Sequence, residues 1–179
     1  MGSRSRSDQP AGAALNARKA SFAPVVDGNT RVLILGSLPG EASLAVGRYY
    51  ANPRNQFWRL VGGVIAGDLP SQDYHARLSA LLGHGIGLWD AIGSATRMGS
   101  LDTAIRDVKA NALADLAMAL PQLRAVAFNG AKAAAIGAPQ LAGMEAVELV
   151  RLPSSSPAHA ALSFNEKLAQ WLSLRKFLL

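Results

Sequence analysis

Four short apolar runs, separated by segments with helical periodicity, constrain the fold of this chain more than any other feature. Each run has the length of a buried strand and ends in glycine, aspartate, asparagine or proline. Strands that alternate with helices predict a mostly parallel sheet covered by helices on both faces. The predicted strands are residues 31–36, 86–90, 125–129 and 147–153.

Helical patterns fill the intervals between the four runs. The clearest begins after Ser163, because Ser163 and Glu166 have the spacing of a capping box and an apolar stripe follows them. Helices are also expected at residues 57–67, 72–85 and 112–120. No internal repeat interrupts this order, so we expect an α/β fold.

The length of 179 residues, half of them hydrophobic, suits one well-buried domain. We place that single domain at residues 21–179. Residues 1–20 lack a periodic apolar face and are expected to form a disordered basic tail. Residues 1–19 carry four basic side chains against one acidic side chain, which is half of the chain's net charge of +6.

Composition excludes several classes of protein. Cysteine is absent, so the chain has no disulfide framework, no thiolate nucleophile and no cysteine-ligated zinc or iron–sulfur site. The longest apolar runs are far shorter than the roughly 20 residues of a membrane helix, and no hydrophobic signal segment opens the chain. We therefore expect a soluble, cytoplasmic protein. Its pI near 10.2 favours a polyanionic partner such as nucleic acid, and hence a nucleoid association.

Polar residues follow each predicted strand. Because the carboxyl ends of parallel strands open onto one rim, these residues are expected to lie together there. Taken singly, each also has a structural explanation, as a helix cap, a tight turn or a loop. The residues are Gly36 to Gly40, Asp90, Asn129 with Gly130, and Ser154 to Ser156.

Four of the eleven aromatic residues lie within ten positions, just beyond the first strand. Phe57 and Trp58 begin a predicted helix, where an aromatic pair usually packs into the core. Tyr50 precedes the ANPRN segment and is a candidate for the ligand site. Tyr49 could take either role.

Three segments together carry a family resemblance: GSLPG at residues 36–40, YYANPRNQFW at 49–58 and LPSSSPAHA at 152–160. In this order they resemble the uracil-DNA glycosylase superfamily, most closely its hypoxanthine-DNA glycosylase-like branch, family six. The resemblance implies a three-layer α/β/α sandwich with a central four-stranded parallel sheet. It also implies monofunctional removal of a deaminated base from single- or double-stranded DNA by a monomer, without cofactor or metal.

The resemblance assigns roles at the reacting bond. A flipped base must be held outside the duplex, and Tyr50 takes the place of the superfamily's stacking aromatic. Asn55 matches the residue taken as catalytic in the hypoxanthine-like branch, and its structural alternative is to cap the helix beginning at Gln56. Leu38 stands where better-known branches have an Asp or Asn, and Leu152 where the classical branch has a His.

His159 is the only histidine near the last loop. It could donate to the departing base, touch a phosphate or face water. We include it with Asn55 as a candidate catalytic residue.

Base recognition is assigned to Asp90, Asn129 and the backbone of Gly36, Ser37 and Leu38. An aspartate accepts hydrogen bonds, so it suits a base that presents an N–H group, as both uracil and hypoxanthine do. Uracil is the first expectation, because it is the superfamily's common substrate, and hypoxanthine the second. Contacts with the DNA backbone are expected from Pro39, Gly40, Ser154, Ser155, Ser156 and Pro157.

Two other functions remain open from the sequence. The absent Asp/Asn and His would suit a non-catalytic DNA-binding module of the same fold. A serine hydrolase could use Ser37 or Ser154 with His159 and Asp90, although the chain has no GxSxG motif.

Overall fold

The computed structural model describes residues 17–179, and its centre is a four-stranded parallel sheet of strand order β3-β2-β6-β7. The four predicted strands are confirmed to within one residue at either end. They are β2 (Val32–Gly36), β3 (Ile86–Asp90), β6 (Ala125–Asn129) and β7 (Glu148–Leu152).

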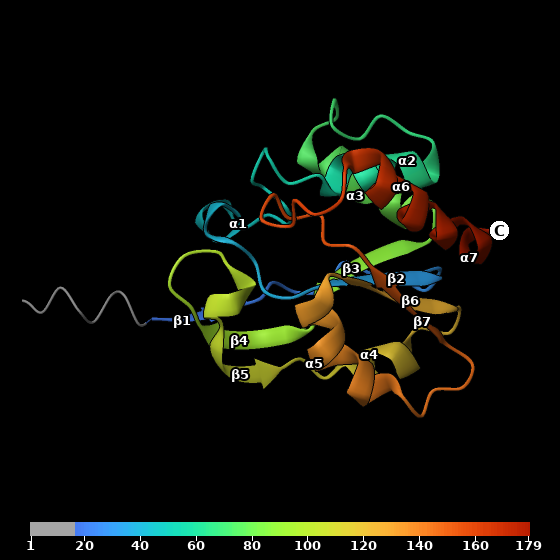
Figure 1. Ribbon diagram of the computed structural model, residues 1–179. Coiled ribbons are helices and arrows are strands. Elements are labelled where there is room, and N and C mark those ends of the chain that lie inside the picture. The colour runs from blue at the N-terminus through green and yellow to red at the C-terminus, as the bar shows by residue number, and fades with distance from the viewer. Residues whose placement is uncertain (1–16) are drawn as a thin grey trace, which may run out of the picture.

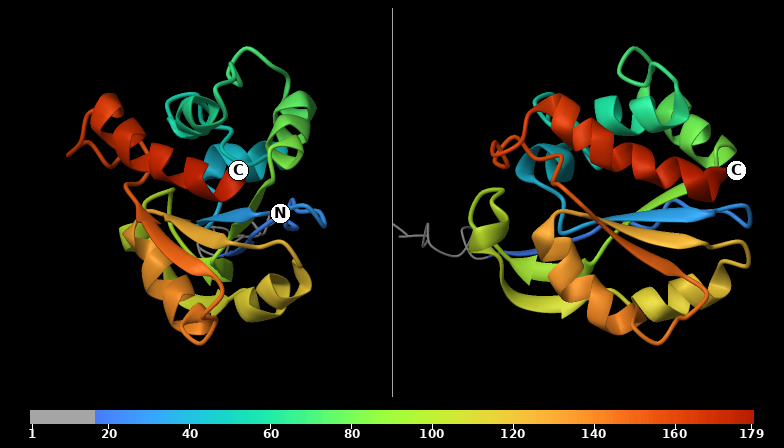
Figure 2. Two further views of the ribbon diagram at one scale, coloured as in Figure 1. Left: turned by 90° about the vertical axis from the view of Figure 1, so that its right-hand side faces the viewer. Right: turned by 45° about the vertical axis from the view of Figure 1, so that its right-hand side comes forward.

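Helices cover both faces of this sheet, which makes the predicted three-layer α/β/α sandwich (Figure 1). One face carries α2 (Phe57–Ile65), α3 (Tyr74–Gly83) and α6 (Phe164–Trp171), and the chain ends in η2 (Leu172–Leu174) and α7 (Arg175–Leu178) on the same side. The opposite face carries α4 (Leu113–Ala119) and α5 (Ala131–Leu141). The two views of Figure 2 show the sheet between these layers.

Alternation along the strands builds two cores. Val32 and Ile34 of β2 face α2 and α6, whereas Leu33 and Leu35 face α4 and α5, and all four are at most 1% exposed. Both faces of a parallel strand are buried, so the sequence reads as a continuous apolar run. This is why the strands could be located from the sequence.

The order of the strands creates a switch point between β2 and β6. The chain leaves β2 toward α2 and α3 on one face, and leaves β6 into α5 on the other. The loops that follow these neighbouring strands therefore diverge. A crevice outside the carboxyl ends is the usual ligand site of such sheets.

A second, antiparallel sheet lies beyond the carboxyl end of the central one, beside α1 (Glu41–Val46) (Figure 1). Its order is β1 (Arg18–Ala20), β4 (Ile92–Thr96) and β5 (Arg106–Ala110), with η1 (Asp102–Ala104) in the connection. The sequence does not predict it, because its strands are short and β5 is exposed throughout. A small cluster of Leu38, Ile92, Ala95 and Ile105 is buried beneath it.

The boundary of the expected disordered tail needs correction. Residues 18–20 pair with β4 in antiparallel register, so main-chain hydrogen bonding orders them despite their polar sequence. Lys19 also forms an ion pair with Glu41. Residues 1–16 of the expected tail lie outside the described residues.

The predicted helices are present with small changes at their ends. α2 stops at Ile65 because Ala66 adopts a left-handed conformation, with φ of +56°. The capping box of α6 is confirmed: Ser163 Oγ accepts from Glu166 N at 3.3 Å, and Glu166 Oε2 accepts from Ser163 N at 2.7 Å. α1 and α5 carry too weak a periodicity to be predicted. Among residues 17–179, every helix is too short or too polar to cross a bilayer.

Candidate active site

The rim of the central sheet brings several of the predicted site residues together. Gly36 at the end of β2 lies opposite Asp90 at the end of β3, and Asn129 at the end of β6 lies opposite Leu152. Tyr50 reaches the same place from the segment between α1 and α2, since its hydroxyl lies 3.2 Å from Asn129 Nδ2. The strand ends and Tyr50 thus form one group of polar atoms.

Gly36 leaves the space on which this group converges. A Cβ atom on residue 36 would lie 2.7 Å from Asp90 Oδ1 and 3.0 Å from Tyr50 Oη. Either distance is shorter than an ordinary contact with carbon, so any side chain here would displace the carboxyl or the hydroxyl. Glycine is therefore needed for the two polar groups to approach the backbone of β2.

The buried Asp90 carboxyl has a pKa near the middle of the pH scale, at about 7. It is 4% exposed, and its Oδ2 has no hydrogen-bond partner among the described residues. Burial, with a smaller contribution from Asp102, raises the pKa of Asp90 to about 7, while Arg97 acts in the opposite direction. An unpartnered buried acceptor is costly in a folded protein, so it marks a place where a ligand donor could bind.

Tyr50 is held rigidly in an unusual conformation. Its φ is +52°, which is uncommon for a bulky residue. Its ring stacks on Phe57 with centroids 3.7 Å apart and planes 7° from parallel, and its carbonyl accepts from Trp58 Nε1 at 3.1 Å. One face of Tyr50 is therefore already covered, so a base could stack only on the opposite face. Burial raises the pKa of the Tyr50 hydroxyl, which stays protonated.

The neighbouring aromatic residues belong to the core. Phe57 is fully buried and Trp58 is 5% exposed, which confirms the prediction that this pair anchors α2. Tyr49, for which both roles were open, is also buried and donates its hydroxyl to the carbonyl of Ala23 at 2.9 Å. Of the four clustered aromatic residues, Tyr50 alone has its hydroxyl at the rim with Asp90 and Asn129.

Asn129 links Tyr50 to the loop after β7. Its Nδ2 donates to Tyr50 Oη at 3.2 Å and to Ser155 Oγ at 2.9 Å, and its Oδ1 accepts from Ser155 N at 2.8 Å. Both amide hydrogens are thereby used within the protein. Asn129 holds the rim together in this structure and has no N–H left to offer a base.

The loop after β7 divides into a buried and an exposed part. Ser155 is 1% exposed, so its hydroxyl faces Asn129 and cannot reach a phosphate in this conformation. Ser154 and Ser156 are half-buried and Pro157 is exposed. The hydroxyls of Ser154 and Ser156 each accept a hydrogen bond from the main-chain N–H two residues further on, at 3.1 Å and 3.2 Å. Of the four residues of this loop that were predicted to contact the DNA backbone, Ser154, Ser156 and Pro157 are accessible.

Asn55 lies one residue before Gln56, the N-cap of α2, and binds the first helical N–H, which is close to the capping role that the sequence offers as its structural alternative. Its Oδ1 accepts from Phe57 N at 2.9 Å, and Phe57 is the first residue of α2. The side chain is half-buried, and within residues 17–179 its Nδ2 donates to no protein group. Gln56, next in sequence, has a buried Oε1 that also lacks a partner in the described part of the chain.

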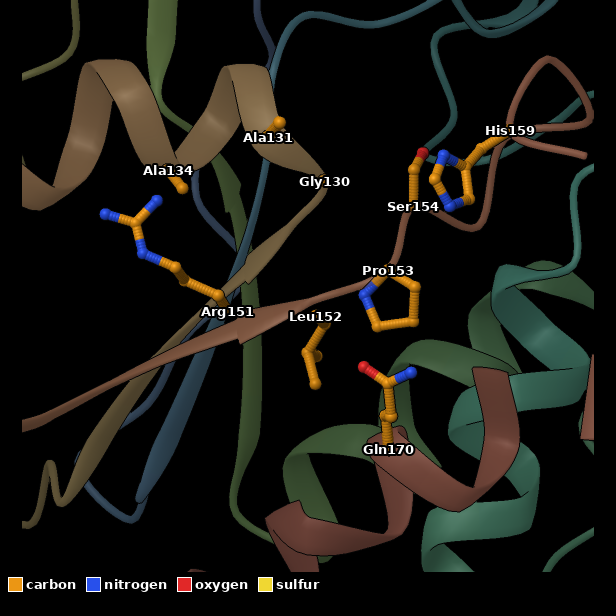
Figure 3. A pocket seen from close by; sticks show the side chains of 9 residues that line it. All are labelled: Gly130, Ala131, Ala134, Arg151, Leu152, Pro153, Ser154, His159 and Gln170. Carbon is orange, nitrogen blue, oxygen red and sulfur yellow. The ribbon is translucent and has the colours of Figure 1, made fainter. Parts of the chain in front are cut away.

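His159 lies apart from the Asp90–Tyr50 group. It lines a pocket of about 360 Å³ beside β7, together with Gly130, Arg151, Ser154 and Gln170 (Figure 3). Neither Asp90 nor Tyr50 lines this pocket. The structure therefore does not bring His159 to the carboxyl that is expected to bind the base.

Two charged residues of the rim were missed from the sequence. Arg97 follows β4 and is 3% exposed, and Asp102 in η1 accepts from Ser37 Oγ at 2.6 Å. They lie in the segment MGSLDTA and its flank, which matches no motif. Their position depends on the unpredicted antiparallel sheet, so no sequence signal could have found them.

The fold and the rim define a class. A parallel sheet with helices on both faces and polar groups at its carboxyl ends is typical of α/β proteins that bind a ligand outside the strand ends. Within residues 17–179, no three His, Cys, Asp or Glu side chains are grouped so as to hold a metal ion. His159 makes no side-chain hydrogen bond with Ser37 or Ser154 in this part of the chain, so the serine hydrolase reading has no geometric support.

The family is shown by comparison with known proteins. The sequence model of the family described as Uracil DNA glycosylase superfamily matches residues 23–175. The chain belongs to the uracil DNA glycosylase superfamily. By family it is a DNA glycosylase of DNA repair, and DNA is its substrate.

Individual relatives agree with this assignment. A protein of Methanosarcina acetivorans named hypoxanthine DNA glycosylase is 42% identical over 153 residues, which cover 86% of this chain and 95% of the relative. A protein of the same name from Methanosarcina barkeri is 47% identical over 115 residues, or 64% and 73% of the two chains. The solution NMR structure of a provisionally named uracil DNA glycosylase from M. acetivorans superposes with a TM-score of 0.81 at 41% identity. It covers 90% of this chain and 99% of that one.

Proposed function

We propose that this protein is a monofunctional DNA glycosylase that flips a deaminated base out of DNA and hydrolyses its N-glycosidic bond. The observation that carries the proposal is the buried Asp90 carboxyl at the rim: its Oδ1 lies beside Gly36, near the Tyr50 hydroxyl, and its Oδ2 has no hydrogen-bond partner among residues 17–179. An unpaired acceptor in an α/β crevice suits a ligand with an N–H group.

The chemistry of deamination makes such an acceptor selective. Adenine N1 and cytosine N3 are hydrogen-bond acceptors, and deamination to hypoxanthine or uracil converts each into an N–H donor. An ionised Asp90 would accept from that N–H and would repel the undamaged parent base, which offers only a lone pair there. Guanine and thymine also carry such N–H groups, and their stable pairing in the duplex opposes their extrusion.

The preferred base is part of the proposal. The sequence alone ranks uracil first and hypoxanthine second. Two relatives with at least 42% identity are named hypoxanthine DNA glycosylase. We therefore propose hypoxanthine as the principal substrate and uracil as the second.

The remaining roles are distributed around the rim. Tyr50 would stack on the base with the ring face opposite Phe57, because Phe57 covers the first face. Asn55 binds the first main-chain N–H of α2 through Oδ1 and keeps Nδ2 for a water molecule or the sugar. Its structural and its catalytic role can therefore coexist. Ser154, Ser156 and Pro157, with Gly40 on the other loop, would contact phosphates, and His159 would touch DNA from its separate pocket. Pro39, which was expected to do the same, is buried in this structure and is left out of the proposal.

The test is cleavage of end-labelled duplexes that carry a single hypoxanthine or a single uracil, followed by alkali. A glycosylase without lyase activity gives strand breaks only after alkali, and we expect the hypoxanthine duplex to react faster. Asn55→Ala should lower the excision rate by about 100-fold while binding to abasic-site DNA stays within a few-fold of wild type. Asn52→Ala is the matched control, because Asn52 Oδ1 accepts an equivalent hydrogen bond from Arg54 N, at 3.0 Å, in the same segment.

A second candidate is a DNA-binding protein of the same superfamily that has lost excision. Leu38 and Leu152 favour it, since they replace the Asp/Asn and the His of better-known branches. Tight binding with no alkali-dependent break on either duplex would establish this alternative and refute the glycosylase proposal. Binding should then depend mainly on Lys and Arg and fall steeply with salt.

A further inference from the structure

We propose that Arg97 is a positioning residue for excision: it fixes the base-binding loop, residues 36–41, against the small antiparallel sheet and does not itself touch the substrate. This inference rests on the proposed function and on the expectation from the sequence that the backbone of Gly36 to Leu38 faces the base. It assigns to the small sheet the role of a platform for that loop.

The guanidinium of Arg97 binds the loop directly. It is buried, and it donates from Nη1 to the carbonyl of Leu38 at 3.3 Å and from Nη2 to the carbonyl of Pro39. Its Nε donates to the carbonyl of Gly99 at 2.8 Å, which orients the group from its own turn. A planar fork with several donors can span adjacent carbonyls in this way, whereas a lysine ammonium is a single point charge.

The same segment holds the rest of the loop. Four consecutive carbonyl oxygens, those of residues 36 to 39, accept hydrogen bonds from residues 91, 92 and 97. Two side chains add to these bonds: Ser37 Oγ donates to Asp102 at 2.6 Å, and Ser100 Oγ accepts from Glu41 N at 2.9 Å. The Ala91 and Ile92 amides supply the first two carbonyl bonds, at 2.8 Å and 3.1 Å.

The side chain of Leu38 completes the attachment. It is 6% exposed and packs with Ile92, Ala95 and Ile105 beneath the small sheet. The residue that stands where other branches have an Asp or Asn is therefore an anchor that points away from the crevice. Loop placement here depends on burial and on Arg97, which is a different solution from a polar residue facing the substrate.

Arg97 is the sensitive point of this arrangement. The bonds from residues 91 and 92 are main-chain bonds and persist in any variant, but one side chain supplies both bonds to Leu38 and Pro39. Without it, two carbonyls lose their donors in a loop that begins beside Asp90 and Tyr50. A displacement of about 1 Å at a reacting site can cost about 100-fold in rate.

The experiment compares Arg97→Met and Arg97→Lys with the full-length wild type. The control is Arg175→Met, because Arg175 likewise donates to two main-chain carbonyls, Val64 at 2.8 Å and Gly63 at 2.7 Å, at the far end of α2. Four quantities are measured: single-turnover excision of hypoxanthine and uracil, affinity for a duplex with a stable abasic-site analogue, Tm, and hydrogen exchange of the peptide spanning residues 36–41.

We expect Arg97→Met to lose about tenfold or more in excision rate and to exchange faster in residues 36–41. Affinity for the abasic duplex should stay within about threefold, since Ser154, Ser156 and Pro157 lie outside the loop and Gly40 is the one proposed phosphate contact within it. Arg97→Lys should keep the charge but not restore the rate. Arg175→Met should retain wild-type excision and loop exchange even if its Tm falls.

Two results would overturn the inference: an Arg97→Met protein with wild-type excision and unchanged exchange, or an equal loss of rate in Arg175→Met that follows Tm. If the wild type excises neither base, the proposed function is wrong. The exchange measurement then decides separately whether Arg97 holds the loop, because it requires no activity.

Discussion

At the scale of single residues, Asp90 is the position where stability and the proposed function conflict. A carboxyl that is buried with an unpaired oxygen destabilises the fold when it ionises. The same property supplies a strong acceptor inside a crevice. The loss of stability and the proposed binding of the base both depend on this carboxyl, so one substitution at Asp90 tests both.

Asp90→Asn should stabilise the protein above pH 7. The folded pKa of about 7 lies above the ordinary value of 3.8, so the folded state keeps a proton that the unfolded state releases between these pH values. Stability from this group is present below about pH 4 and falls as pH rises to about 7, by up to about 4 kcal/mol. Denaturant unfolding at pH 5 and pH 8 should show the variant gaining on wild type as pH rises; a pH-independent difference would contradict this origin.

Excision should follow the ionisation of the same carboxyl. If the carboxylate accepts the N–H of the flipped base, the single-turnover rate rises with pH through about 7. In Asp90→Asn the rise should disappear and the rate at pH 8 should fall by about 10- to 100-fold, as expected for a lost charged hydrogen bond. A rate profile identical to wild type would remove Asp90 from base recognition.

Tyr50 can be dissected by two substitutions. Tyr50→Phe keeps the stack on Phe57 and removes the acceptor of Asn129 Nδ2, whereas Tyr50→Ala removes the ring as well. Base stacking is worth about 1 to 3 kcal/mol, so Ala should slow excision by about 10- to 100-fold and Phe by much less. Equal rates for Tyr50→Ala and wild type would place the base elsewhere.

At the scale of elements, the loops after β6 and β7 are joined by side chains. Asn129 and Ser155 form two hydrogen bonds in buried surroundings, and the carbonyl of Ser155 accepts from Gln56 N at 3.0 Å. Helix α2 is therefore tied at its start to the loop after β7. This bond network connects the segment that carries Asn55 with the loop that is proposed to contact the DNA backbone.

Ser155→Ala should destabilise the fold by about 1 to 3 kcal/mol, because a buried N–H of Asn129 loses its acceptor. Ser156→Ala is the control: its hydroxyl accepts from Ala158 N in a half-buried turn, and its loss should cost about 1 kcal/mol or less. Thermal unfolding of both variants makes the comparison. Equal costs would mean that the Asn129 bond is not important for stability.

At the scale of the whole molecule, two sheets share the rim. The central sheet supplies the strand ends, and the antiparallel sheet holds the first loop in place. Strand β1 is the first described element and pairs with β4, and Lys19 reaches Glu41 at the start of α1. The beginning of the described chain therefore supports the site from outside the central core.

Two shortened chains test this arrangement. Removing residues 1–16 should leave the excision rate unchanged and reduce the salt slope of non-specific DNA binding only slightly, since this segment carries two arginines and one aspartate. Removing residues 1–20 also deletes β1 and should lower both Tm and excision. Indistinguishable activities and melting temperatures for the two chains would show that β1 is dispensable.

The sequence alone determined the central sheet, the helices α2, α3, α4 and α6 and the residues at the rim, because those signals are local. Val32 to Leu35 read as a buried strand, Ser163 and Glu166 as a helix start, and parallel strand ends bring Gly36, Asp90 and Asn129 to one edge whatever the side-chain detail. The three segments that carry the family resemblance are equally legible.

Only the tertiary structure decided how these residues are used. β4 and β5 have too little apolar content to be recognised, and their pairing joins segments distant in sequence. That pairing and the contacts between loops decide three features of the site. They are the hydrogen-bond partners of Asn129, the burial of Leu38 beneath the small sheet, and the hydrogen bonds from Arg97 to the carbonyls of residues 38 and 39. Hydrogen bonds and burial between distant segments leave no periodic trace in a sequence, because they depend on where the backbone places each side chain.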